Sequence, residues 1–101
     1  RPWVQGALNR AELQQAIEEV MSQPPRALAA KAVSGSLVVR AWVGTSGRVS
    51  RVSTVSQSLW SRDPATSQQW ERWVLERWKA ARFAAKKKPS VVTVPVMFDS
   101  A

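Results

Sequence analysis

The chain has 101 residues, of which 45% are hydrophobic and 22% charged, a composition typical of one small globular domain and not of a disordered segment. It contains no cysteine and no histidine, which excludes disulfides, thiolate chemistry and the usual zinc and iron ligands. The formal net charge of +8 favours anionic partners, although the solubility of a small domain explains it equally well.

The first predicted element is a helix over residues 9–22. Asn9 is a favoured N-cap residue, and Glu12 follows at the spacing of a capping box. Apolar residues then recur at helical spacing until the Gln-Pro-Pro segment at 23–25, where neither proline can donate a backbone hydrogen bond. The alanine-rich stretch 26–34 is compatible with another short helix or with a packed loop.

A β-hairpin is predicted next, with strands at 36–43 and 48–58 and a turn at 44–47. Apolar and polar residues alternate along the first strand, as expected for a strand with two different faces. The valines of the second strand recur three residues apart instead of two. We therefore expect a bulge there, or a strand with both faces partly covered.

A second long helix is predicted to start at Ala65 or Ser67 and to end at Arg82, with Asp63 as its cap and Pro64 in its first turn. Three of its side chains, Trp70, Trp73 and Trp78, lie on or beside an apolar seam and are expected to be mostly buried, because each removes roughly 150–250 Å² from water. We expect an intrahelical cation–π contact between Trp73 and Arg77. Trp42 and Trp60 are expected to be the more exposed tryptophans, and Lys86–Lys88 a solvated loop.

A final strand is predicted at 91–98. Because Pro95 cannot donate to a ladder, this strand should lie at a sheet edge along at least part of its length. The predicted fold class is α+β, a three-stranded antiparallel sheet with two helices packed on one face. The element order is helix, strand, strand, helix, strand, in a single domain covering residues 1–101.

Catalysis is not expected from this set of residues. General acid–base chemistry has no histidine to use, and no serine has an evident activating partner. Gly44 and Gly47 fit a hairpin turn better than a phosphate-binding loop. We therefore predict that the protein is not an enzyme and has no cofactor and no metal site.

Two kinds of binding surface remain. The segment 70–83 interleaves tryptophan with arginine and lysine, as nucleic-acid platforms do, but its tryptophans share the apolar seam and therefore favour a packed helix. The final strand has an apolar edge, uncharged from Pro89 to Phe98. Such an edge is either protected from pairing by its proline or binds an extended peptide as an added strand. The sequence alone supports these two interpretations equally.

Residues 23–98 resemble the C-terminal domain of TonB and its paralogues. The matching pieces are GSLVVRAWVGTSGRVSRVSTVSQS at 35–58, a helix that closes in Arg82-Phe83, and VVTVPVMF at 91–98. Pro25 stands ten residues before Gly35 and lines up with the proline of the family's Gln-Pro-x-Tyr-Pro segment. The chain departs from the pattern at Pro24, which replaces the tyrosine, and at Ala81, which replaces a tryptophan. Helix 9–22 is an addition to the family-like core.

The resemblance implies an energy-transducing domain on the periplasmic side of the inner membrane. It implies an N-terminal transmembrane anchor outside this sequence, through which such proteins contact the ExbB/ExbD motor. It also implies that the last strand binds the Ton box, an extended peptide of TonB-dependent outer-membrane receptors for siderophores, haem or cobalamin, by strand addition. The expected partner-binding residues are Val91, Val92, Thr93, Val94, Val96, Met97, Gln23, Pro25 and Arg26.

Two alternatives stay open at this point. A TolA-like periplasmic adaptor would share the architecture but bind other partners. A basic nucleic-acid-binding module ranks third, and no nucleic acid is expected as a partner. The sequence does not decide whether the protein forms a homodimer, since a small sheet with open edges permits strand swapping.

Overall fold

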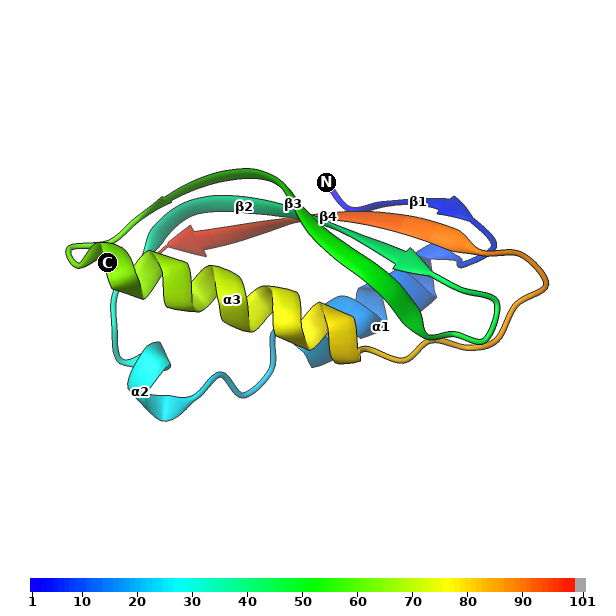
Figure 1. Cartoon of the computed structure of the whole chain (residues 1–101), viewed down its shortest axis with the longest axis horizontal. Helices are drawn as coiled ribbons and strands as arrows, with labels where there is room; N and C mark the ends of the chain where they lie inside the picture. The colour runs from blue at the N-terminus through cyan, green and yellow to red at the C-terminus, as the bar shows by residue number, and fades with distance from the viewer. Residues whose placement is uncertain (100–101) are drawn as a thin grey trace.

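Four strands and three helices make up residues 1–99, the part of the chain that the computed structural model describes (Figure 1). In chain order they are β1 (Trp3–Gly6), α1 (Arg10–Val20), α2 (Arg26–Ala29), β2 (Ser34–Val43), β3 (Val49–Trp60), α3 (Pro64–Ala80) and β4 (Ser90–Asp99). All strand pairs are antiparallel, and the order across the sheet is β1-β4-β2-β3. The α+β class is confirmed. The predicted three strands and two helices are wrong, because β1 and α2 are additional.

The unpredicted strand β1 is fastened to the start of β4. Gly6 adopts a φ of 122°, and a Cβ atom at this position would collide with the carbonyl oxygen of Pro89, so the close approach of the two chains requires glycine. Just after β1, the backbone N–H of Leu8 donates to Ser90 Oγ at 2.9 Å. A strand of four residues is too short to show a period in the sequence, and its partner is distant along the chain.

The helix starts follow the sequence signals. Asn9 Oδ1 accepts from the backbone N–H of Glu12 at 2.8 Å, and Glu12 Oε1 accepts from the N–H of Asn9 at 3.0 Å, which confirms the capping box. At α3, the Asp63 side chain accepts from the N–H of Ala65 at 3.1 Å, and Pro64 occupies the first turn as predicted. The alanine-rich stretch forms the single turn α2, the first of the two alternatives.

The hairpin of β2 and β3 contains two register shifts, between Val38 and Val39 and between Trp42 and Val43. They account for the three-residue spacing of the valines in β3, because an extra residue on one strand changes which face the next residue occupies. The predicted bulge is thus confirmed. Both shifts also increase the local twist of β3, which forms one outer edge of the sheet.

The turn of this hairpin is held by the segment after α3. Phe83 donates its backbone N–H to the Gly47 carbonyl at 2.9 Å, and Lys86 donates to the Thr45 carbonyl at 2.9 Å. Gly47 has a φ of 86°, and a Cβ there would collide with the carbonyl oxygen of Phe83. The Arg82-Phe83 pair, just beyond the end of α3 at Ala80, therefore docks on the turn, with the Phe83 ring partly buried against the core.

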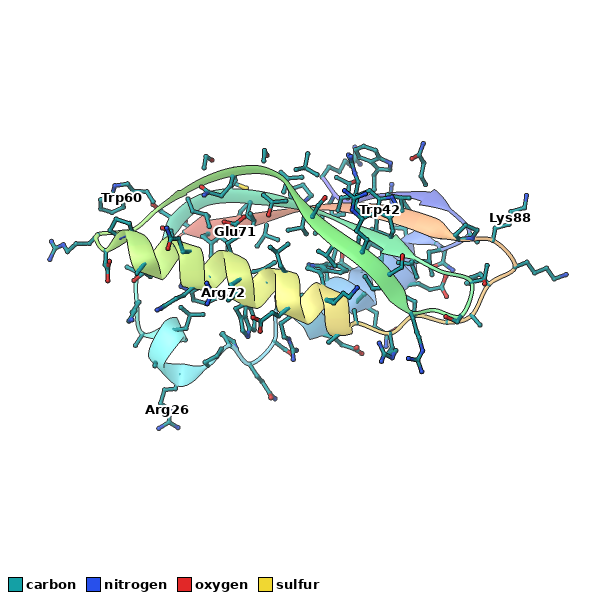
Figure 2. All side chains as sticks on the ribbon, viewed as in Figure 1. Arg26, Trp42, Trp60, Glu71, Arg72 and Lys88 are labelled. Carbon is teal, nitrogen blue, oxygen red and sulfur yellow. The ribbon has the colours of Figure 1, made fainter. Side chains whose placement is uncertain are left out.

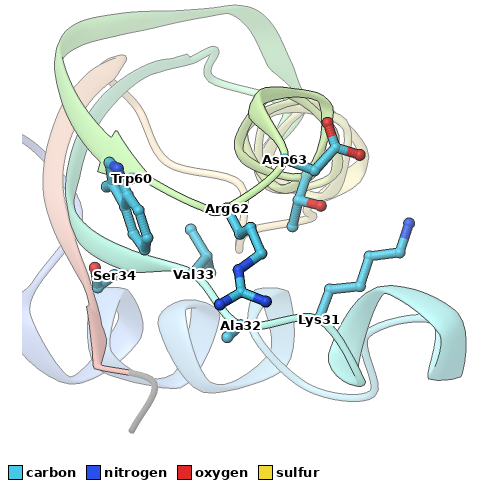
Figure 3. Close-up of a pocket in the computed structure, with 8 residues that line it drawn as sticks. Lys31, Ala32, Val33, Ser34, Trp60, Arg62 and Asp63 are labelled. Carbon is cyan, nitrogen blue, oxygen red and sulfur yellow. The ribbon is translucent and has the colours of Figure 1, made fainter.

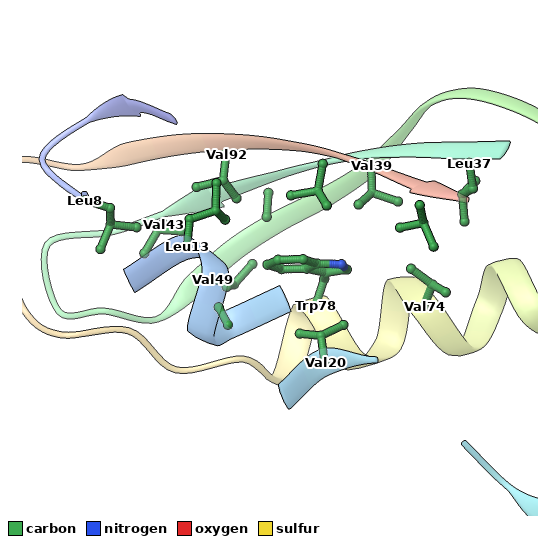
Figure 4. Close-up of a cluster of buried hydrophobic side chains, with 14 residues drawn as sticks. Leu8, Leu13, Val20, Leu37, Val39, Val43, Val49, Val74, Trp78 and Val92 are labelled. Carbon is green, nitrogen blue, oxygen red and sulfur yellow. The ribbon is translucent and has the colours of Figure 1, made fainter. Parts of the chain in front are cut away.

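The core lies between α1, α3 and the face of the sheet that they cover (Figure 4). Trp78 is fully buried at its centre, and Trp70 is buried in a second cluster with Leu28 and Val33. Trp73 is partly buried, and the Arg77 guanidinium carbon stands 5.7 Å from its ring centre, as predicted. The remaining members of the main cluster are Leu8, Leu13, Ala16, Val20, Leu37, Val39, Ala41, Val43, Val49, Val74, Val92, Val94 and Val96.

The lysine run is not merely solvated, since Lys86 Nζ pairs with Glu12 Oε1 at 3.0 Å. The pKa of the Glu12 carboxyl lies below its ordinary value of 4.5, first because its oxygen accepts the Asn9 backbone N–H and then because of Lys86. A carboxyl whose pKa is lower in the folded state stabilises the fold above its unfolded pKa. That contribution is lost as the pH falls through the folded pKa.

We expect Glu12→Gln to lower the melting temperature at pH 7, because glutamine keeps the capping hydrogen bond and loses the charge. The deficit relative to wild type should shrink as the pH is lowered from 4.5 through the depressed pKa of Glu12. Circular dichroism melts at several pH values measure it, with Glu18→Gln as the control for removing an exposed charge from the same helix. A deficit independent of pH would contradict the assignment.

Candidate functional site: the open edge of β4

Strand β4 has neighbours of unequal length on its two sides. β2 pairs with it from Ser90 to Asp99, whereas β1 pairs with it only from Ser90 to Thr93. Beyond Thr93, the outer side of β4 faces no other strand of residues 1–99. The prediction that this strand is an edge along part of its length is confirmed, and the open part is Val94–Asp99.

The prediction that one open edge covers residues 91–98 needs correction. Val91, Val92 and Thr93 are taken up by β1, opposite Gln5, Val4 and Trp3 respectively. These three are therefore not available to an added strand while β1 is in place. Val94, Val96 and Met97 keep the open position expected of them, and their role in binding stays a prediction.

Residues 1 and 2, which precede β1 in this sequence, do not pair with the open part. Residues 1–2 line a small hollow with three residues of α1, namely Arg10, Leu13 and Gln14. Residues 1–2 therefore lie towards α1, and no strand within residues 1–99 pairs with the outer side of β4 from Val94 onwards.

The proline in β4 determines which backbone groups face outwards. Pro95 lies opposite Val38 of β2 and has no N–H to give to that ladder, so its nitrogen must face the open side. Because the backbone direction alternates along a strand, the N–H and C=O of Met97 face the open side as well. An incoming strand thus finds an acceptor at Pro95 and a donor with an acceptor at Met97.

Side chains along this edge differ between the two faces of the sheet. Val94 and Val96 are buried towards the helices, and the Phe98 ring packs on Trp70 with their centres 5.3 Å apart. On the helix-free face, Pro95 is half-buried and Met97 is 74% exposed, more than any other large hydrophobic residue of the described chain. An added strand would cover Met97 and leave the core undisturbed.

The helix-free face of the sheet also carries two arginine–tryptophan pairs. The guanidinium carbon of Arg40 stands 6.0 Å from the ring centre of Trp3, and that of Arg51 stands 4.6 Å from the ring centre of Trp42 (Figure 2 labels Trp42). Six of the seven acidic residues lie on the helices or their caps, namely Glu12, Glu18 and Glu19 on α1, and Asp63, Glu71 and Glu76 on α3 or its cap. The seventh, Asp99, ends β4 and lies by alternation on the same face as Met97, at its far end. This face is therefore positively charged around Arg40 and Arg51.

Three predicted partner-binding residues lie outside the sheet. Gln23 and Pro25 are exposed in the connection from α1 to α2, where Gln23 adopts a φ of 53°. Arg26 is exposed at the start of α2 and points away from the sheet in Figure 2. The residue of α2 that packs towards the end of β4 is Leu28, whose cluster includes Phe98 at its margin. Residues 23–29 thus pack against the end of β4 on the helix-covered face of the sheet and do not lie beside its open edge.

A hollow of about 590 Å³ opens at the far end of the hairpin (Figure 3). Its lining residues are Lys31, Ala32, Val33, Ser34, Trp60, Arg62, Asp63 and Thr66. Trp60 is 68% exposed and forms one wall, in agreement with the sequence prediction for this residue. The hollow presents an indole, two cations and one carboxylate, and its lining comes from the start of β2, the end of β3, the start of α3 and the connections beside them, not from β4.

Within residues 1–99, no three His, Cys, Asp or Glu side chains are grouped to hold a metal ion. No helix within the same range is long and apolar enough to cross a membrane. Comparison of the chain with protein-family models, with curated proteins and with solved structures finds no match.

Proposed function

We propose that this protein binds an extended peptide by adding it as a strand along Val94–Asp99 of β4. The observation that carries the proposal is that β4 is paired on both sides up to Thr93 and on one side beyond it. In strand addition, backbone hydrogen bonds supply affinity and alternate side chains supply specificity. The other outer edge, β3, is a weaker candidate because its two bulges twist it and interrupt a regular ladder.

We further propose the biological role of a TonB-like C-terminal domain. In this role the domain works on the periplasmic side of the inner membrane, receives energy through ExbB/ExbD, and grips the Ton box of an outer-membrane receptor for a siderophore, haem or cobalamin. The order of hairpin, helix and edge strand supports this reading, as does the docking of Arg82-Phe83 on the hairpin turn. A TolA-like adaptor would use the same edge for a different partner.

Nucleic-acid binding is a second candidate, and one observation favours it. The pairs Trp3–Arg40 and Trp42–Arg51 place aromatic rings and cations on the helix-free face. Because Trp70 and Trp78 are buried, α3 does not offer the exposed aromatic platform for base stacking that segment 70–83 suggested. Salt-dependent binding of a single-stranded oligonucleotide, with quenching of tryptophan fluorescence, would support this candidate.

The test is a titration of the ¹⁵N-labelled protein with a Ton-box peptide, followed by amide chemical shifts. We expect saturable shifts concentrated on Val94–Asp99 and on the β2 residues opposite them, with the β3 edge unaffected. Sedimentation at two protein concentrations, without peptide, shows whether a second copy occupies the edge instead. Shifts confined to β3, or the absence of saturable shifts, would overturn the proposal.

A further inference from the structure

The side chain of Arg40 belongs to β2 but lies over the neighbouring strand β4. Its Nε–H donates to Thr93 Oγ1 at 3.1 Å, and its guanidinium carbon is 6.0 Å from the ring centre of Trp3 on β1. The strand registers place Trp3, Thr93 and Arg40 in one row across three strands. The guanidinium is therefore held beside Trp3, the first residue of β1, where the covered part of β4 gives way to its open edge.

Most of the hydrogen-bonding capacity of this guanidinium is unused. Nε–H is the one donor of Arg40 that has a partner among residues 1–99, and an arginine side chain has five N–H groups. Asp99 is the one acidic residue of β4, and at about 3.3 Å per residue it lies roughly 20 Å along the strand from the Thr93 row. Arg40 is thus a preoriented cation without a carboxylate beside it.

A strand added at the open edge would lie in line with β1 and pass this cation. Side chains on one face of a strand repeat every second residue, so the first outward position after the Trp3 row lies opposite Pro95, about 7 Å further along. A glutamate side chain at that position can reach back to the guanidinium. The next outward position lies opposite Met97, which is 74% exposed and offers an apolar contact.

We infer that the strand bound along Val94–Asp99 carries an acidic side chain opposite Pro95, paired with Arg40, and an apolar side chain opposite Met97. This inference rests on the proposed function and adds the chemistry of the partner. It favours a peptide over nucleic acid as the occupant, because the outward-facing backbone groups of Pro95 and Met97 can pair with an added strand.

The experiment uses three versions of the Ton-box peptide that differ at one position. Intermolecular NOEs to the Pro95 side chain identify the peptide residue opposite it, and this residue is made Glu, Gln or Lys. We expect the Glu peptide to bind wild type about two- to fivefold more tightly than the Gln peptide, the range for an exposed ion pair. The difference should disappear in Arg40→Gln, reverse in favour of the Lys peptide in Arg40→Glu, and shrink at 1 M salt.

Arg51→Gln is the matched control. Arg51 also stands over a tryptophan on the helix-free face, but it belongs to β3, at the opposite edge of the sheet from β1. This variant should therefore keep the Glu-over-Gln preference. Equal binding of the Glu and Gln peptides at β4, or a preference that persists in Arg40→Gln, would overturn the inference and leave the proposed function standing. Failure of all three peptides to bind at β4 would overturn both.

Discussion

Replacing Trp78 with alanine is expected to lower the free energy of unfolding by about 3–5 kcal/mol, the range for large-to-small changes of a buried aromatic residue. The Trp78 side chain projects from α3 into the space between the sheet and α1 and has no exposed surface (Figure 4). No other side chain can fill the space that it leaves. Since domains of this size are stable by about 5–15 kcal/mol, the variant should be near the limit of folding. Urea unfolding followed by circular dichroism measures the loss.

Trp60→Ala is the control, because it makes the same change at a tryptophan that is 68% exposed. We expect it to alter stability by less than about 0.5 kcal/mol, as surface substitutions usually do. Trp78→Phe should be milder than Trp78→Ala, since it leaves a smaller cavity and removes an indole N–H that is buried without a hydrogen-bond partner. Similar losses at Trp78 and Trp60 would show that the core is not centred on Trp78.

Met97→Pro is expected to weaken binding of the Ton-box peptide at least tenfold while the protein stays folded. The substitution removes the N–H that faces the open edge and places a second ring beside that of Pro95 on the surface where a strand would add. Tenfold corresponds to about 1.4 kcal/mol, which is within the net value of one or two hydrogen bonds plus a steric clash. Fluorescence anisotropy with a labelled peptide measures the affinity.

Met97→Ala separates the backbone from the side chain in this prediction. Alanine keeps the N–H and loses only the apolar contact of an exposed methionine. The peptide affinity of the Met97→Ala variant should therefore fall less than that of Met97→Pro. Thermal melts of both variants show whether the fold survives. Wild-type affinity in a folded Met97→Pro would mean that the peptide does not add to this strand.

Local signals in the sequence predicted the local structure well. The capping box at Asn9 and Glu12 and the Asp63-Pro64 start of α3 depend on residues at most three apart, and each was found as expected. The hairpin and its bulge could also be predicted, because the alternation along β2 and the three-residue valine spacing in β3 are each visible within a single strand. Residues that are close in the chain define their own geometry without reference to the rest of the fold.

Features that depend on distant segments could not be predicted in the same way. The sequence indicated an edge strand through Pro95, but nothing near residues 91–93 shows that β1 covers them, since the two segments meet from opposite ends of the chain. Arg40 could be assigned to the outward face of its strand. Its position over β4 follows from the strand order β1-β4-β2, which only the folded chain defines.

The short strand β1 has a mechanical consequence. A pull on the chain ahead of Trp3 loads the ladder between Trp3–Gly6 and β4 before it loads the longer ladders on either side of β2. Detachment of β1 would expose the edge back to Ser90 and so lengthen the track to which a strand can bind. Under the proposed function, tension transmitted from that side would strengthen the grip on the peptide, as in a catch bond.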